Sequence, residues 1–257
     1  MVGRSNGNVW LTSRDEMALS WFSVVRISNV DTVRWLLGAV NGWDRPVQIR
    51  QAQRWIARME TAGKIRRAAL GTPGGSVVWA TAEVPGARRP NLFAQTTRHE
   101  IAVSAASARY ALAGFAWQED ERPATRGGHR ADGVAIGADD HASLIEVELT
   151  PKRARRYAQI FATYRRRLDR GETDRVVYLC NPDSAAAVRA ALRQPAARPV
   201  AGRIDVHVTY GPQTAAWEGD ELPRWLDPLA FIGDSAVAVG GDVDPAVARG
   251  QVNRGKH

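Results

Sequence analysis

Three carboxylates stand close together between positions 132 and 148, at a spacing that could support metal chemistry. Asp132 opens one apolar run (132–136), while Glu146 and Glu148 lie in the next run (143–149). If the second run is a β-strand, the two glutamates point to the same face, because side chains alternate along a strand. Carboxylates that converge from neighbouring strands repel one another unless a cation lies between them, and oxygen ligands suit Mg²⁺. We therefore expect Asp132, Glu146 and Glu148 to bind Mg²⁺ or Mn²⁺.

Phosphodiester hydrolysis is the chemistry that such a site could perform. A bound metal polarises the phosphodiester and lowers the pKa of a bound water, whose proton Glu148 could accept. Lys152 could supply a cation from the start of the following helix. A structural interpretation is also open, in which the glutamates form ion pairs with Arg130, Arg153 or Arg156 and bind no metal.

The elements predicted between residues 94 and 227 would place these carboxylates on one sheet. A helix is expected at 97–112, strands near 115–121, 132–136 and 143–149, and a basic helix at 151–170 with Thr150 as its N-cap. A strand at 175–180, a helix at 184–193 and a strand at 203–210 follow. The predicted order is therefore α-β-β-β-α-β, then α-β.

Residues 11–82 predict a second, N-terminal domain. Helices are expected from Ser13, from near Asn29 and over 47–61, and a β-hairpin over 64–80. The third helix has apolar residues at i, i+3, i+4 and i+7, namely Ala52, Trp55, Ile56 and Met59. Three helices closed by a hairpin form a winged helix-turn-helix, so the expected fold class is α/β (α+β) with two domains. Residues 83–93 would be the linker, and the Gly-, Ala- and Asp-rich segment 228–257 a flexible tail.

Basic residues are concentrated in the third helix and the hairpin of this N-terminal domain. A helix-turn-helix places its third helix in the major groove, and hairpin cations contact phosphates. The predicted DNA-binding residues are Arg50, Arg54, Arg58, Lys64, Arg66 and Arg67, with Arg153 and Arg156 beside the carboxylates. The alternatives are a solvated helix face and a winged helix that binds protein.

Composition narrows the classes of partner. The 257 residues carry a formal net charge of +8, which favours double-stranded DNA as a polyanionic partner. The single cysteine, Cys180, excludes a disulfide framework and a Cys-rich zinc site. With no run of about 18 apolar residues and no signal peptide, we expect a cytoplasmic, nucleoid-associated bacterial protein without a membrane partner. A palindromic target would imply a homodimer or a larger nucleoprotein complex, although no dimerisation helix is evident.

The order of elements, with Asp132 at the second strand and Glu146-Val147-Glu148 at the third, resembles the PD-(D/E)XK nuclease superfamily. The resemblance implies that Asp132 and Glu146 hold Mg²⁺. Glu148 stands where the superfamily's lysine usually lies, a departure shared with some restriction enzymes, and Lys152 is the alternative cation. Inactive members of the superfamily bind DNA or protein, and loss of the lysine is one mark of them.

Two residues of the first predicted helix of this domain are further candidates. Glu100 resembles the extra helical acid that some PD-(D/E)XK nucleases use. His99, next to it, could orient a carboxylate or contact phosphate, or it could be a packed structural histidine.

The whole layout also resembles the replication-relaxation family of actinobacterial plasmids and mobile elements. The matching stretches are 97–103, 130–133 and 146–150, within a resemblance that covers roughly residues 12–210. It implies a role in plasmid replication, DNA relaxation or element transfer. Three functions are therefore expected as alternatives: a Mg²⁺-dependent endonuclease, a non-catalytic DNA-binding regulator or replication accessory protein, and a protein-interaction subunit.

Overall fold

The computed structural model describes residues 9–70, 75–121, 128–212 and 216–226. Over these ranges the chain forms seven α-helices and two β-sheets, which agrees with the expected mixed α and β class. The predicted tail at 228–257 and parts of the predicted hairpin turn and of the loop before His129 lie outside the described residues. The chain divides into two compact units, Met1–Leu222 and Pro223–His257; the described part of the second is the 3-10 turn Arg224–Leu226.

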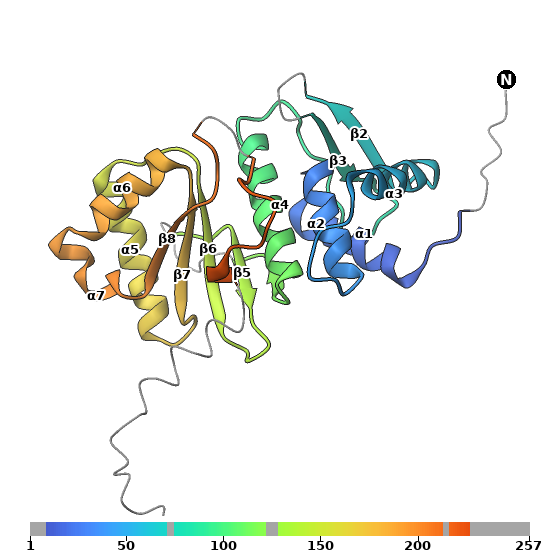
Figure 1. Cartoon of the computed structure of the whole chain (residues 1–257). Helices are drawn as coiled ribbons and strands as arrows, with labels where there is room; N and C mark the ends of the chain where they lie inside the picture. The colour runs from blue at the N-terminus through green and yellow to red at the C-terminus, as the bar shows by residue number, and fades with distance from the viewer. Residues whose placement is uncertain (1–8, 71–74, 122–127, 213–215, 227–257) are drawn as a thin grey trace, which may run out of the picture. The chain divides into compact units, whose positions relative to one another are not determined.

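Three helices and a three-stranded antiparallel sheet make up the N-terminal part of the first unit (Figure 1). The helices are α1 (Ser13–Val25), α2 (Val30–Val40) and α3 (Ile49–Thr61), and the strands are β1 (Ser28–Asn29), β2 (Ile65–Ala69) and β3 (Ser76–Ala80). The strand order is β1-β3-β2. The three helices and the β2–β3 hairpin were predicted, whereas β1 was not, because two residues carry no periodic signal.

The helices of this part form where local sequence and packing agree. Thr12 and Asp15 form a reciprocal capping box at the start of α1. Asn29 caps α2 by accepting a hydrogen bond from the Thr32 backbone. The predicted apolar face of α3 is buried, with Ile56 and Met59 fully inaccessible to solvent.

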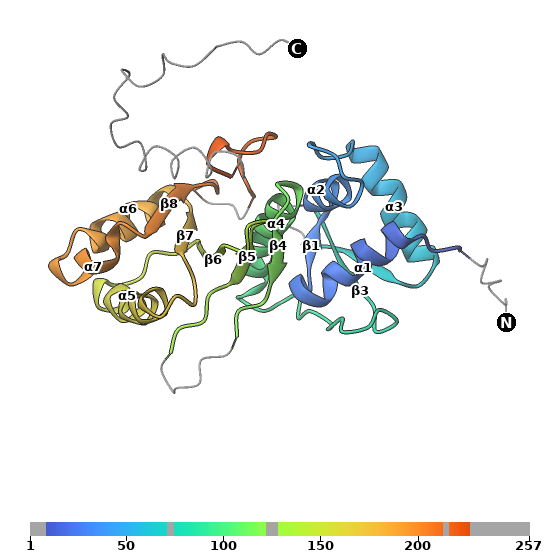
Figure 2. The same ribbon diagram turned by 90° about the horizontal axis from the view of Figure 1, so that it is seen from below.

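The second sheet has five strands in the order β4-β5-β6-β7-β8. They are β4 (Ala116–Gln118), β5 (Gly133–Ile136), β6 (Ala142–Glu148), β7 (Arg175–Cys180) and β8 (Ile204–Val208). Strand β5 is antiparallel to its neighbours β4 and β6, and β6, β7 and β8 are parallel. In Figure 2, α4 (Thr97–Leu112) lies on one face, and α5 (Ala154–Asp169) and α6 (Pro182–Leu192) lie on the other; the short α7 (Arg198–Ala201) follows α6.

The start of α5 differs from the prediction. The helix begins at Ala154 rather than at Pro151, and its N-cap is Arg153, which makes no side-chain capping hydrogen bond. The expected N-cap, Thr150, therefore lies outside the helix. The backbone N–H of Lys152 donates to the hydroxyl of Tyr157 at 3.1 Å, and its ammonium contacts Glu148. These two contacts of Lys152 keep the segment between β6 and α5 out of the helix.

Helix α4 packs against both sheets of the first unit. Its residues Ala108 and Leu112 join the core formed by α1, α2 and α3. The indole N–H of Trp21 donates to the Ser107 hydroxyl at 2.9 Å, and the Tyr210 hydroxyl donates to the Ala102 carbonyl at 2.8 Å. This packing fixes the position of the helix that carries His99. Among the described helices, none has the length and apolar character needed to span a membrane.

Candidate functional site

The three predicted carboxylates lie at one end of the β5–β6 pair. Asp132 immediately precedes β5, and its backbone N–H donates to the carbonyl of Ile145 at 2.9 Å. The Asp132 carboxylate in turn accepts a hydrogen bond from the Val147 backbone at 2.8 Å. Because β5 and β6 are antiparallel, the beginning of one lies beside the end of the other. The register therefore places Asp132 opposite Glu146, with its carboxylate at the Val147 backbone, so the three predicted acids share this end of the strand pair.

Glu146 is a buried carboxylate with two side-chain partners. It is 3% exposed, and its Oε1 atom contacts the hydroxyl of Tyr164 and lies 2.8 Å from Nε2 of His129. The rings of His129 and Tyr164 meet edge to face with centroids 5.6 Å apart. Burial, with the charge of Asp132 nearby, raises the pKa of Glu146 well above its ordinary value. Burial, with Lys152 and Arg156 nearby, lowers the pKa of His129 to about 4, so both groups are driven toward their neutral forms.

Glu148 is paired with Lys152, the cation that was predicted at the start of the next helix. The Lys152 ammonium contacts the Glu148 carboxylate, which is 5% exposed. Burial raises the pKa of Glu148, although Lys152 opposes this by hydrogen bonding and charge. The predicted alternative pairs of the glutamates with Arg130, Arg153 or Arg156 are not among the ion pairs of the described residues. Arg130 instead pairs with Glu119 at 2.8 Å.

His99, on α4, reaches the same cluster from the other face of the sheet. Its Nε2 atom lies 3.0 Å from the carbonyl oxygen of Val147 and 3.3 Å from Oδ2 of Asp132. Burial alone would lower the pKa of His99, but the hydrogen bond and charge of Asp132 outweigh it and raise the pKa to about 9. The Asp132 carboxylate and the Val147 carbonyl therefore converge on Nε2 of His99, and the raised pKa favours the protonated form of the ring.

A hollow of about 380 Å³ opens beside these groups. It is lined by Arg98 and His99 of α4 and Gln95 just before it, and by Glu148 at the end of β6 and Lys152 in the connection that follows. Arg98 is exposed at its rim and was not among the predicted site residues. The Glu148–Lys152 pair is therefore open to a ligand on this side, whereas Glu146 is enclosed.

The structure separates Glu100 from the site. Its carboxylate lies 3.6 Å from the Arg26 guanidinium and 3.4 Å from the Thr96 hydroxyl. Its described contacts include neither Asp132 nor Glu146. Glu100 points toward α1 because it lies on a different side of α4 from His99, one residue away.

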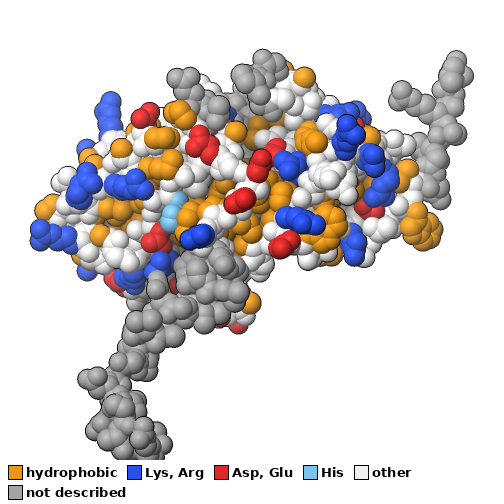
Figure 3. Space-filling view, in the orientation of Figure 1, with side chains coloured by type: hydrophobic (Ala, Val, Ile, Leu, Met, Phe, Trp, Pro, Cys, Tyr) orange, Lys and Arg blue, Asp and Glu red, His pale blue; other side chains and the backbone are white. Residues whose placement is uncertain are grey.

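The predicted DNA-binding residues divide into paired and unpaired cations. Arg58 contacts the buried carboxylate of Asp15, Arg67 lies 3.2 Å from Glu60, and Lys64 lies 4.0 Å from Glu83. The described residues include no acid paired with Arg50, Arg54, Arg66, Arg153 or Arg156, and all five are exposed. Figure 3 shows Lys and Arg side chains gathered over the region of α3 and β2.

Tyr164 was missed by the sequence analysis. The only sequence signal for His129 is its position three residues before Asp132. Tyr164 falls on the apolar stripe of α5 with Tyr157, Ile160 and Phe161, so periodicity assigns it to the core. Its ring does pack there, while its hydroxyl extends to Glu146. No pattern in the sequence distinguishes a core tyrosine from one whose hydroxyl holds a carboxylate.

The donor types fit a hard divalent cation, but the side chains are not gathered around one point. Within the described ranges, no group of three or more His, Cys, Asp and Glu side chains is placed to hold a metal ion. The Asp132, Glu146 and Glu148 carboxylates are bonded to His99, His129, Tyr164 and Lys152 instead. A metal would therefore have to displace hydrogen-bond donors.

Comparison with known proteins gives no match to this chain, whether among protein-family models, curated proteins or solved structures.

Proposed function

We propose that this protein binds DNA and carries a divalent-metal-dependent phosphodiesterase site of the PD-(D/E)XK type, which cleaves or nicks the DNA. The observation that carries the proposal is the place of the carboxylates in the sheet. They lie where the antiparallel β5–β6 pair ends, beside the parallel strand β7 and between α4 on one face of the sheet and α5 on the other. The order α4-β4-β5-β6-α5-β7 is the one that suggested the resemblance.

The contact between Glu148 and Lys152 supports a catalytic role for that pair. Glu148 stands where a lysine is usual, and an ammonium reaches the same place from four residues downstream. At the open hollow, Lys152 would orient an attacking water or neutralise a phosphate oxygen, while Glu148 accepts the proton of the water.

Asp132, Glu146 and the carbonyl of Val147 would hold Mg²⁺ or Mn²⁺. The ion, once bound, would polarise the phosphodiester and lower the pKa of a bound water. Two of these oxygens already converge, since the Val147 carbonyl and Asp132 lie 3.0 Å and 3.3 Å from Nε2 of His99, which a bound ion would displace. Tyr164 would keep the Glu146 carboxylate oriented.

DNA binding is assigned to the N-terminal helices and hairpin as a winged helix. Helix α3 would enter the major groove, and Arg66 on β2 would contact phosphate. The resemblance to the replication-relaxation family supports a role in plasmid or mobile-element replication or transfer.

A non-catalytic DNA-binding protein is the second candidate, and one observation favours it. The carboxylates are already bonded to protein donors, and no metal-ready cluster exists among the described residues. In that case the cluster stabilises the fold, and the protein binds DNA as a regulator or replication accessory.

Calorimetric titration of Mn²⁺ separates the two candidates. The phosphodiesterase proposal predicts saturable binding to wild type and to the control Glu100→Gln, whose acid lies outside the cluster, but none to Glu146→Gln. Binding that survives Glu146→Gln, or is absent from wild type while DNA is still bound, would contradict the metal site.

A further inference from the structure

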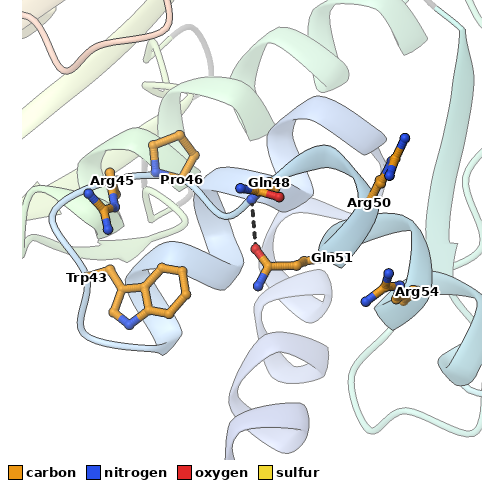
Figure 4. Close-up of a pocket in the computed structure, with 7 residues that line it drawn as sticks. All are labelled: Trp43, Arg45, Pro46, Gln48, Arg50, Gln51 and Arg54. Carbon is orange, nitrogen blue, oxygen red and sulfur yellow. Dashed lines mark hydrogen bonds between the residues drawn. The ribbon is translucent and has the colours of Figure 1, made fainter.

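A second feature with ligand-binding character lies away from the carboxylates, between the α2–α3 connection and the first turns of α3. It is an open hollow of about 700 Å³, lined by Trp43, Arg45, Gln48, Arg50, Gln51 and Arg54. Figure 4 shows Trp43 and Arg45 at one side and Arg50 and Arg54 at the other. A hydrogen bond of 2.9 Å from the Gln48 backbone to the Gln51 side chain fixes the turn between them.

The arginines of this hollow form no ion pair with the described residues. Arg45, Arg50 and Arg54 are exposed, and no described acid forms an ion pair with them. Arg50 and Arg54 stand four residues apart on α3, a rise of about 6 Å along the helix. Three arginines without carboxylate partners among the described residues therefore line one hollow, with Asp44 as the only acid in the connection 41–48.

Trp43 gives the hollow an aromatic wall. Its side chain is 43% exposed, whereas Trp35 and Trp55 of the neighbouring helices are 0% and 8% exposed. Leaving an indole in water forfeits burial of a large apolar surface, so its position is not explained by packing. A flat ring of this kind stacks well on a nucleobase or a sugar.

We propose that this hollow binds the backbone of a nucleic-acid strand, with the arginines on phosphates and Trp43 against a sugar or base. Guanidinium groups match phosphate oxygens with paired hydrogen bonds. A single small anion would occupy only part of the volume. An acidic peptide would satisfy the arginines, but a nucleic-acid strand offers both phosphates and a flat base or sugar at every residue along its length. The inference rests on the DNA partner of the proposed function and not on its metal site.

The expected DNA contact therefore shifts toward the N-terminal end of α3 and the connection that precedes it. The sequence predicted a stripe through Arg50, Arg54 and Arg58, but Arg58 is held by Asp15. The hollow instead extends the contact backward to Arg45 and Trp43. These two residues were not among the predicted DNA-binding residues.

The test is binding of a fluorescent 30-base-pair DNA duplex to the full chain in EDTA, measured at several salt concentrations. The triple variant Arg45→Gln, Arg50→Gln, Arg54→Gln should lose at least tenfold in affinity and reduce the salt slope by about 2 to 3. Trp43→Ala should lose about fivefold or more in affinity, with an unchanged salt slope. The matched control removes three exposed arginines outside the hollow, Arg89, Arg193 and Arg198.

Equal losses in the hollow variant and the charge-matched control would overturn the proposal, because charge alone would then explain binding. The proposal would also be overturned, in favour of a protein partner, if wild type does not bind DNA but binds a polyglutamate peptide through the same arginines. Hollow-dependent DNA binding in a protein that shows no Mn²⁺ binding would support the inference and remove only the phosphodiesterase site.

Discussion

Glu146 is the carboxylate whose environment most limits what the site can do. It is almost inaccessible to solvent, its pKa is raised by burial, and one of its oxygens is shared by Tyr164 and His129. A charged carboxylate in such a place is costly unless donors or a cation stabilise it. Tyr164 and His129 therefore act as positioning residues that hold Glu146 in one orientation.

Replacement of Tyr164 by Phe tests that role. Tyr164→Phe should lower Mn²⁺ affinity about tenfold, because a donor that orients a metal ligand is lost. It should also cost about 1 kcal/mol of stability for the missing hydrogen bond. Calorimetry and denaturant unfolding measure the two effects. Tyr210→Phe is the control, since its buried hydroxyl donates to the Ala102 carbonyl; equal losses of Mn²⁺ affinity in both variants would rule out a positioning role.

Single residues were predictable from the sequence where strand spacing decides which side chains converge. Asp132, Glu146 and Glu148 follow from two neighbouring strands with alternating side chains. The Lys152 contact was one of two alternatives, since a side chain at the start of the next element can turn toward the strand or away from it. Glu100 was grouped with the site because it resembles the extra helical acid of some PD-(D/E)XK nucleases, but it points away from the side of α4 that carries His99.

Strand β5 presents Asp132 to the site, and a glycine allows its close packing. A Cβ atom added to Gly133 would overlap the indole of Trp117, which lies across it. Gly133→Ala should therefore displace β5 or the indole and cost about 1 to 3 kcal/mol of stability. Thermal unfolding checks this against Gly202→Ala, where a Cβ meets no atom within 4 Å. Equal melting temperatures for the two variants would contradict this prediction, because they would show that β5 accommodates the added Cβ without loss of stability.

Asp15 of α1 is an ionised carboxylate that is hydrogen-bonded to Arg58 of α3, so the stability of the fold should depend on pH. Burial alone would raise the pKa of Asp15, but hydrogen bonds from Arg58, Thr12 and Trp55 outweigh it and lower the pKa to about 2. A depressed pKa stabilises the fold above the unfolded value of 3.8, and the contribution is lost as pH falls through about 2.

Stability measured by urea unfolding from pH 6 to pH 2 tests this linkage. Asp15→Asn should cost about 1 to 2 kcal/mol at pH 6, and the difference from wild type should disappear near pH 2. Glu16→Gln removes an exposed acid of the same turn and should change little. A constant difference between wild type and Asp15→Asn across this range would contradict the assignment.

Most elements followed from apolar periodicity, including α4 and β7 with their ends in place. The start of α5 did not, because the contacts of Lys152 with Glu148 and Tyr157 override the local preference of a Thr-Pro pair. Strand β1 did not either, since its pairing with β3 comes from tertiary packing rather than from its own two residues.

Over the molecule as a whole, the sequence predicted a basic protein with cations on the N-terminal domain and on the helix after the carboxylates, but not which cations form ion pairs. Arg109 illustrates the limit. It is 1% exposed, and its guanidinium lies 4.2 Å from the Trp35 ring and 4.8 Å from the Trp217 ring, so it stabilises the packing of α4 rather than a ligand. A net charge computed from composition includes this arginine although it is buried and cannot contact DNA, because composition gives no information on burial.

Cleavage of supercoiled plasmid tests the central claim most directly. Wild type and the Glu100→Gln control should convert it to nicked or linear DNA with Mn²⁺ and leave it intact in EDTA, whereas Glu146→Gln should bind the plasmid without cutting it. Cleavage by Glu146→Gln at the wild-type rate, or no cleavage by wild type while the plasmid is bound, would contradict the assignment of a phosphodiesterase to these carboxylates.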